Sequence, residues 1–224
     1  MEPNAVVGRA LRTPRAAGIA GVLFAVLLTA ALVLVRLATP PEASDTGAWL
    51  ADPGRKRQVV LALNLVPFAG IAFLWFIGVM RDRIGHHEDQ FFATVFLGSG
   101  LLFVAMLFVA SAVTAGYLAA TAGGATGFSR RIGGVVLHTY AMRMASVFTI
   151  STATIGLRAG FLPPWLGFLG YGIALILLLV IDVTPWVELL FPLWILLLSL
   201  DTLIESFAGT RGKGDAPLSP SLLT

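Results

Sequence analysis

Arg143 carries the strongest chemical implication of any residue in this sequence, because it lies inside an apolar run from Ile132 to Leu157. If that run is one helix, Arg143 lies about 16 Å from its start at 1.5 Å per residue, close to the middle of a bilayer. An arginine surrounded by lipid at that depth costs from about 2.5 to more than 10 kcal/mol. We therefore expect Arg143 to face protein or a water-filled cavity.

Other polar side chains fall near the line of Arg143 when the run is drawn as a helix with 100° per residue. They are Thr139, Tyr140, Ser146, Ser151, Thr154 and Arg158. Serine and threonine in membrane helices commonly hydrogen-bond a neighbouring helix, which is the simpler interpretation of this polar stripe. A path for a ligand or an ion along the stripe is the alternative.

Three polar residues of other apolar runs are expected at similar depths, because alternate helices enter the membrane from the same side. Asn64, His138 and Glu188 would lie about 9, 9 and 5 Å inside the second, fourth and sixth runs. The long stem of Arg143 can extend toward that side, and Glu188 is its predicted counter-ion. Two of these residues also have structural explanations. Glu188 could interact with a helix dipole, and Asn64 could satisfy the carbonyl that Pro67 leaves free.

The run from His86 to Asp89, with the sequence HHED, is the only cluster with the residue types of a metal site. Its spacing is poor, because adjacent histidines point to different sides of a helix and no second ligand pair follows. The chain contains no cysteine, which excludes thiolate ligands and nucleophiles. Phosphate-binding, dinucleotide-binding and GxSxG motifs are also lacking. We predict no metal, no cofactor and no catalytic residue.

The composition requires a solvent other than water for most of this chain. Apolar residues make up 57% of the 224 positions and charged residues only 12%, whereas soluble domains average roughly 25% charged residues. The formal net charge of +3 comes mainly from arginines near the ends of the apolar runs, which suits anionic lipid headgroups better than nucleic acid.

Six runs are long and apolar enough to be drawn as transmembrane helices, which need about 20 residues each. They are Ala16 to Val35, Gln58 to Met80, Phe91 to Ala120, Ile132 to Leu157, Leu166 to Ile181, and Thr184 to about Glu205. The predicted fold class is all-α, a polytopic membrane helical bundle with six transmembrane helices. A basic segment (1–15) precedes this transmembrane domain (16–206), and a flexible tail (207–224) follows it.

The distribution of lysine and arginine favours both termini in the cytoplasm. With that orientation the inner loops carry eight basic residues and the outer loops six, and the first run follows Arg9, Arg12 and Arg15. The first run is too long for the apolar region of a signal peptide, so we expect an uncleaved anchor. The predicted location is the cell inner (cytoplasmic) membrane, as a multi-pass protein.

Four segments resemble a family of uncharacterised bacterial membrane proteins, found in actinobacteria, with six predicted helices. They are LNLVPFAGIAFLWFIGVMRDR, FFATVFLGSGLLFVAMLF, YAMRMASVFTISTATIGLR and LPPWLGFLGYGIALILLL. The resemblance extends from Arg12 to Glu205. It implies bacterial origin, residence in the cytoplasmic membrane and six spans, and it implies no activity and no catalytic residue.

Three functions are compatible with these features. The first is a non-enzymatic membrane protein that binds a lipid or apolar ligand, or serves as an accessory subunit of a membrane complex or homo-oligomer. The second is a small transporter or channel with a polar path around Arg143. The third is an intramembrane lipid-modifying enzyme, which would need a nucleophile or metal near His138 or the HHED run.

Overall fold

Every regular element in the described part of the chain is a helix. The computed structural model describes residues 14–39, 48–84, 90–119, 128–179 and 185–211. In chain order the elements are α1 (Pro14–Ala38), the 3-10 helix η3 (Ala48–Ala51), α2 (Pro53–Ile84), α3 (Gln90–Ala119), α4 (Phe128–Val135), the π-helix η5 (Val136–Ala141), α5 (Met142–Ala159), α6 (Pro164–Leu179), the 3-10 helix η6 (Pro185–Leu189) and α7 (Leu190–Arg211). With α4, η5 and α5 taken as one continuous rod, six helices follow one another in the order of the six predicted runs.

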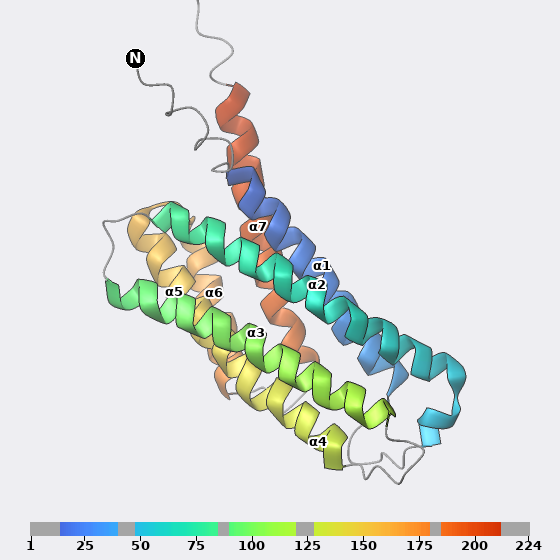
Figure 1. Ribbon diagram of the computed structural model, residues 1–224. Helices are drawn as coiled ribbons and strands as arrows, with labels where there is room; N and C mark the ends of the chain where they lie inside the picture. The colour runs from blue at the N-terminus through green and yellow to red at the C-terminus, as the bar shows by residue number, and fades with distance from the viewer. Residues whose placement is uncertain (1–13, 40–47, 85–89, 120–127, 180–184, 212–224) are drawn as a thin grey trace, which may run out of the picture.

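The helices form a bundle in which α1 packs along both α2 and α7, while α3 packs against α2 and the α4–η5–α5 rod (Figure 1). Helix α6 packs mainly on α5. Four segments have the length and composition to cross a membrane: Ala16–Ala38, Pro53–Arg81, Phe91–Ala119 and Trp186–Ser206. The all-α prediction is confirmed, and these apolar helices identify a multi-pass membrane protein.

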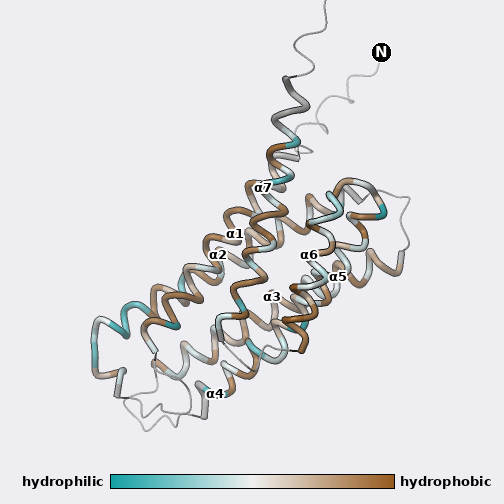
Figure 2. Tube along the Cα trace, turned by 180° about the vertical axis from the view of Figure 1, so that it is seen from behind, coloured by the Kyte–Doolittle hydropathy of each residue, from teal (hydrophilic) through white to brown (hydrophobic). Residues whose placement is uncertain are grey.

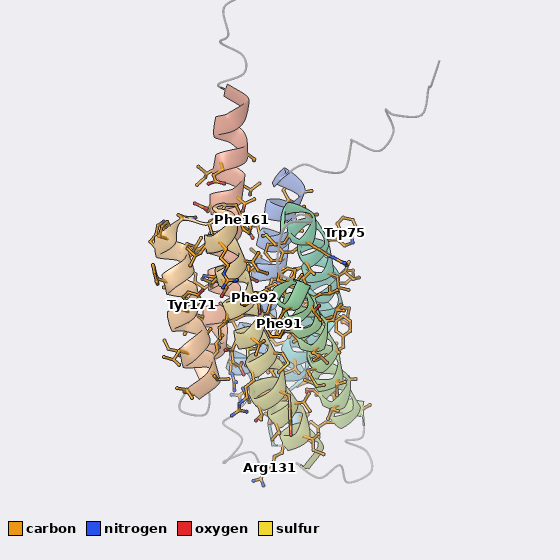
Figure 3. All side chains as sticks on the ribbon, turned by 90° about the vertical axis from the view of Figure 1, so that its left-hand side faces the viewer. Trp75, Phe91, Phe92, Arg131, Phe161 and Tyr171 are labelled. Carbon is orange, nitrogen blue, oxygen red and sulfur yellow. The ribbon has the colours of Figure 1, made fainter. Side chains whose placement is uncertain are left out.

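The bundle presents apolar side chains outward, as a protein surrounded by lipid does. Trp75 is 70% exposed and points away from the bundle (Figure 3), and Phe68 and Ile204 are exposed to a similar degree. Strongly hydrophilic stretches lie toward the ends of the rods, including the beginning of α2 (Figure 2). Such an outer surface would aggregate in water, whereas hydrocarbon accommodates it.

The second helix begins earlier than hydropathy predicts, at Pro53 instead of Gln58. Asp52 provides the reason, because its Oδ1 accepts hydrogen bonds from the backbone N–H groups of Gly54 (2.8 Å) and Arg55 (3.4 Å). An aspartate cap followed by proline in the first helical position is a strong helix start, so the polar residues after it are already helical.

The break between α5 and α6 is tight. Gly160 has φ of 72°, a left-handed conformation that glycine adopts without steric cost. The backbone N–H of Leu162 then donates to the carbonyl of Gly156 at 3.2 Å, and Pro164 opens α6. At the end of the chain, α7 continues to Arg211 and so includes the first residues of the predicted tail.

The centre of the bundle is an aromatic cluster to which five helices contribute one phenylalanine each. Its members are Phe24 (α1), Phe73 (α2), Phe103 (α3), Phe148 (α5) and Phe191 (α7), all completely buried. Phe73 contacts the other four, with ring centroids 4.5 to 5.9 Å away. Edge-to-face and tilted aromatic contacts of this kind add about 0.5–1.5 kcal/mol per pair beyond area burial, so they fix how these helices face one another.

Candidate functional site

Three ionisable side chains from distant parts of the sequence meet at one end of the bundle. They are Arg36 at the end of α1, His138 in η5 and Glu188 in η6, and we call them the triad. Arg36 Nη2 lies 3.2 Å from Glu188 Oε2 in an ion pair. His138 Nδ1 contacts Glu188 Oε1, and Arg36 Nη2 lies 3.1 Å from His138 Nε2.

These contacts define one consistent arrangement of protons. Arginine has only donors, so Nε2 of His138 must accept from Arg36 and carries no proton. With Nε2 as the acceptor, His138 Nδ1 carries the ring proton and faces the carboxylate of Glu188. The imidazole is neutral in this arrangement, and the triad as a whole has no net charge.

Glu188 is the most deeply buried member, with its side chain 1% exposed, against 23% for Arg36 and 21% for His138. A buried carboxylate is strongly unfavourable unless it is both paired and hydrogen-bonded. Arg36 meets both requirements at Oε2. The buried Oε1 contacts His138 Nδ1 and has no hydrogen bond from a described residue. Ionisable groups held at such a cost among membrane helices commonly mark a ligand or ion site.

The π-helix η5 positions His138. In its wider turn the backbone N–H of Met142 bonds to the carbonyl of Leu137, five residues earlier. Arg143 supports this segment, because its Nη1 donates to the backbone carbonyl of Thr139 at 2.9 Å. Single π turns inside helices are uncommon and occur frequently at functional sites.

A partly open cavity of about 100 Å³ lies beside the triad. Its wall is mostly apolar, with Leu28 and Leu32 from α1, Ala62 and Val66 from α2, and Leu107 from α3. Two hydroxyl groups at its border are already engaged with their own helices: Thr39 donates to the carbonyl of Val35 and Thr114 to that of Ala110. The triad is thus the ionisable part of a cavity whose wall is otherwise mostly apolar.

Of the predicted site residues, the structure brings His138 and Glu188 together, at the end where depth alone placed both. The predicted pair of Glu188 with Arg143 is wrong. Among the described residues Glu188 pairs with Arg36 and His138, while the guanidinium of Arg143 bonds within its own rod. Depth along a helix is fixed by counting residues, but the facing of the helix is not.

The other predicted site residues lie apart from the cavity. Asn64 is exposed on α2, and Tyr140 is 55% exposed on η5. Ser146 is fully buried, and its hydroxyl donates to the carbonyl of Ala174 in α6 at 2.7 Å. Thr154 and Tyr171 form a second bond between α5 and α6, at 2.8 Å. For Ser146 and Thr154 the geometry matches the helix-packing interpretation of the polar stripe.

Arg36 is the site residue that sequence reasoning misses, because it directly follows the first predicted run, Ala16 to Val35, and is one of the six basic residues assigned to the outer loops. The sequence does contain a signal for it. Arg36 lies just after the end of the first run, on the side from which the fourth and sixth runs start, so the depth argument that joined His138 to Glu188 includes it too.

No group of three or more histidine, cysteine, aspartate or glutamate side chains suited to a metal ion occurs among the described residues. The HHED run lies outside the described residues. Comparisons of the chain with protein-family models, with curated proteins and with solved structures found no match.

Proposed function

We propose that this protein is a non-enzymatic multi-pass membrane protein that binds a lipid or another amphiphilic molecule in the cavity beside the triad. The observation that carries the proposal is the combination of an apolar, partly open wall with a charged cluster on one side. Binding sites for small molecules are typically apolar, with a few polar groups that fix the orientation of the ligand.

The proposed membrane arrangement has six spans, with both termini on the cytoplasmic side of the inner membrane. In this arrangement the α4–η5–α5 rod and α6 are added to the four candidate spans as the remaining two. Helix α6 has only 16 residues and extends about 24 Å. Arg131, at the end of the bundle where α4 begins, would then lie on the outer side, and Phe161 toward the inner side (Figure 3). The triad lies near the outer end, so a ligand would enter from the outer leaflet.

The cavity suits an amphiphile better than a wholly polar solute. The cavity is small, about 100 Å³, and its wall is mostly apolar, so it offers a large hydrated molecule few partners for its polar groups. Since the cavity is partly open, an apolar chain can occupy the space between α1, α2 and α3 and continue into the surrounding lipid. Its polar head would then meet the triad.

A small transporter is the second candidate, favoured by the three ionisable groups that the triad places among membrane helices. The polar path of such a transporter would run through the triad, because the hydroxyl of Ser146 is engaged with Ala174.

The binding proposal is tested by filling the cavity. Leu63 lines it and Leu61, on the same helix, is 51% exposed on the outside. We expect saturable binding of the fluorescent fatty acid cis-parinaric acid to the wild-type protein in phosphatidylcholine nanodiscs, loss of at least tenfold in affinity for Leu63→Trp, and no change for Leu61→Trp. Equal binding by the two variants would overturn the proposal.

A further inference from the structure

The triad presents its basic members to a ligand and keeps its carboxylate behind them. Glu188 has 1% of its side chain exposed and both carboxylate oxygens in contact with basic groups, whereas Arg36 and His138 retain more than a fifth of their exposure. A polar head that approaches from the cavity therefore meets the guanidinium and the imidazole first. Both groups match an anion, and guanidinium matches the oxygens of phosphate, sulfonate or carboxylate heads in particular.

Charge balance opposes the binding of an anion beside the triad unless one of the ionisable residues there changes its charge. The triad is neutral when His138 is neutral, so a bound anion would leave one net negative charge against an apolar wall. Isolated charge in a low-dielectric environment is unfavourable, and such sites respond by gaining or losing a proton. Of the described residues that line the cavity, only Arg36, His138 and Glu188 carry ionisable side chains. Those contributed by η3, α2, α3 and α4 carry none.

His138 is the residue that can gain the compensating proton, because histidine is the side chain whose charge ordinarily changes between pH 5 and 8. Its Nε2 accepts from Arg36. Once Nε2 gains a proton it becomes a second donor and can no longer accept, so Arg36 and His138 would both point donors at the same oxygen atoms of a ligand. The proton comes from solvent, and no covalent bond other than the new N–H changes.

We infer that the cavity binds an anionic amphiphile together with one proton, which His138 takes up. This inference rests on the proposed binding function and adds to it the charge of the ligand and a coupled protonation. One proton taken up on binding makes the affinity fall by at most about tenfold per pH unit as pH rises.

The experiment uses probes whose own charge does not depend on pH. Binding of octanesulfonate, octanol and octyltrimethylammonium to the full-length protein in phosphatidylcholine nanodiscs is measured by calorimetry between pH 5.5 and 8.5, with empty nanodiscs as the blank. We expect octanesulfonate to bind more tightly than octanol at low pH and to lose at least tenfold in affinity toward high pH. Octanol should bind with an affinity independent of pH, and octyltrimethylammonium should bind most weakly.

Three variants distinguish the uptake of a proton by His138 from the binding of the anion itself. In His138→Gln the affinity for octanesulfonate should not depend on pH. In Glu188→Gln, where the triad is positive without a proton, octanesulfonate should bind about equally at pH 5.5 and 8.5. Arg131→Gln, at an exposed position outside the cavity lining, should behave as wild type. A pH dependence that persists in His138→Gln, or equal affinity for the sulfonate and the ammonium probe, would overturn the inference.

Failure of octanol and octanesulfonate alike to bind would instead count against the proposed function. A further experiment tells whether the anion is a membrane lipid or a free single-chain amphiphile. Nanodiscs with equal amounts of phosphatidylglycerol and phosphatidylcholine are analysed by native mass spectrometry. Retention of phosphatidylglycerol, reduced in Arg36→Gln, identifies a membrane lipid as the ligand. Binding of octanesulfonate without retention of phosphatidylglycerol identifies a free single-chain amphiphile.

Discussion

Glu188 and Arg36 are separated by 152 positions in the chain, yet their side chains form an ion pair with 3.2 Å between Nη2 and Oε2. The pair joins the end of the first long helix to the short helix that precedes the last one. His138 contacts both residues from the middle of the chain. One cluster therefore ties together the end of α1, the α4–η5–α5 rod and η6 on the same side of the bundle.

Removal of Arg36 should destabilise the protein strongly. In Arg36→Leu the carboxylate of Glu188 stays buried without its arginine, and loss of one partner of a buried ion pair costs about 3–5 kcal/mol. We expect a lower thermal unfolding temperature in nanodiscs. The double variant Arg36→Leu/Glu188→Gln should recover most of the loss, because it removes both charges. A double variant as unstable as the single one would show that packing of the Arg36 stem, and not the ion pair, is what matters.

Arg143 should act on the site through the π-helix. Its guanidinium holds the carbonyl of Thr139, one residue after His138. We expect Arg143→Leu to loosen η5 and to reduce binding of octanesulfonate more than tenfold, while Arg143→Lys, which keeps a donor, retains part of the binding. The measurement is the affinity together with the chemical shifts of a ¹⁵N-labelled His138 ring. Ring shifts identical to wild type in Arg143→Leu would contradict this positioning role.

Two glycines of α6 form a matched pair for testing the packing of α7. A Cβ added to Gly170 would lie 2.9 Å from the buried ring of Trp194, while one added to Gly172 would meet nothing within 4 Å. We expect Gly170→Ala to lower the free energy of unfolding by about 1–3 kcal/mol through overpacking. Gly172→Ala should raise it by up to about 1 kcal/mol through helix propensity. Equal effects of the two substitutions in a denaturant titration would mean that α6 does not contact Trp194 closely.

The bond from Ser146 to Ala174 is expected to stabilise the contact between α5 and α6 modestly. Ser146→Ala should cost about 0.5–1.5 kcal/mol, since the hydroxyl spans two helices. Ser151→Ala is the control, because Ser151 donates to the carbonyl of Val147 in its own helix. Thermal unfolding of the two variants should differ in that order, and a larger loss for Ser151→Ala would contradict it.

The topology can be read from single cysteines, because the chain has none of its own. Arg55→Cys and Arg131→Cys lie at the end of the bundle that carries the triad, and Arg81→Cys lies at the opposite end of α2. In intact cells an impermeant maleimide should label the first two and leave the third unlabelled. Labelling of Arg81→Cys alone would reverse the proposed orientation.

Hydropathy predicts the helices well because the free energy of burying backbone in lipid depends on length and composition, both of which are local in the sequence. It misses the beginning of α2, where the cap at Asp52 extends the helix through polar residues. Which side chains pair at the site cannot be predicted from length and composition. Residue counting places His138, Glu188 and Arg36 at one depth, but whether side chains meet depends on how each helix is rotated.

The rotation of the fourth helical rod could not be predicted, because six residues from Val136 form a π-helix. A drawing with 100° per residue assumes uniform turns, and the wider turn changes the facing of everything before Met142 relative to everything after it. A uniform drawing already places Tyr140 and Ser146 about 120° apart, on either side of Arg143, and the wider turn changes their relative facing further. Tyr140 is mostly exposed, and Ser146 is fully buried.

The five-helix phenylalanine cluster has a consequence for biosynthesis. Phe191 contacts Phe24, Phe73, Phe103 and Phe148, but it is made last, in the final helix. Until the ribosome has delivered α7, the face of α1 that will receive it stays uncovered. A chain truncated before Leu190 would lack Phe191 and would leave the other four rings of the cluster without their contact to α7.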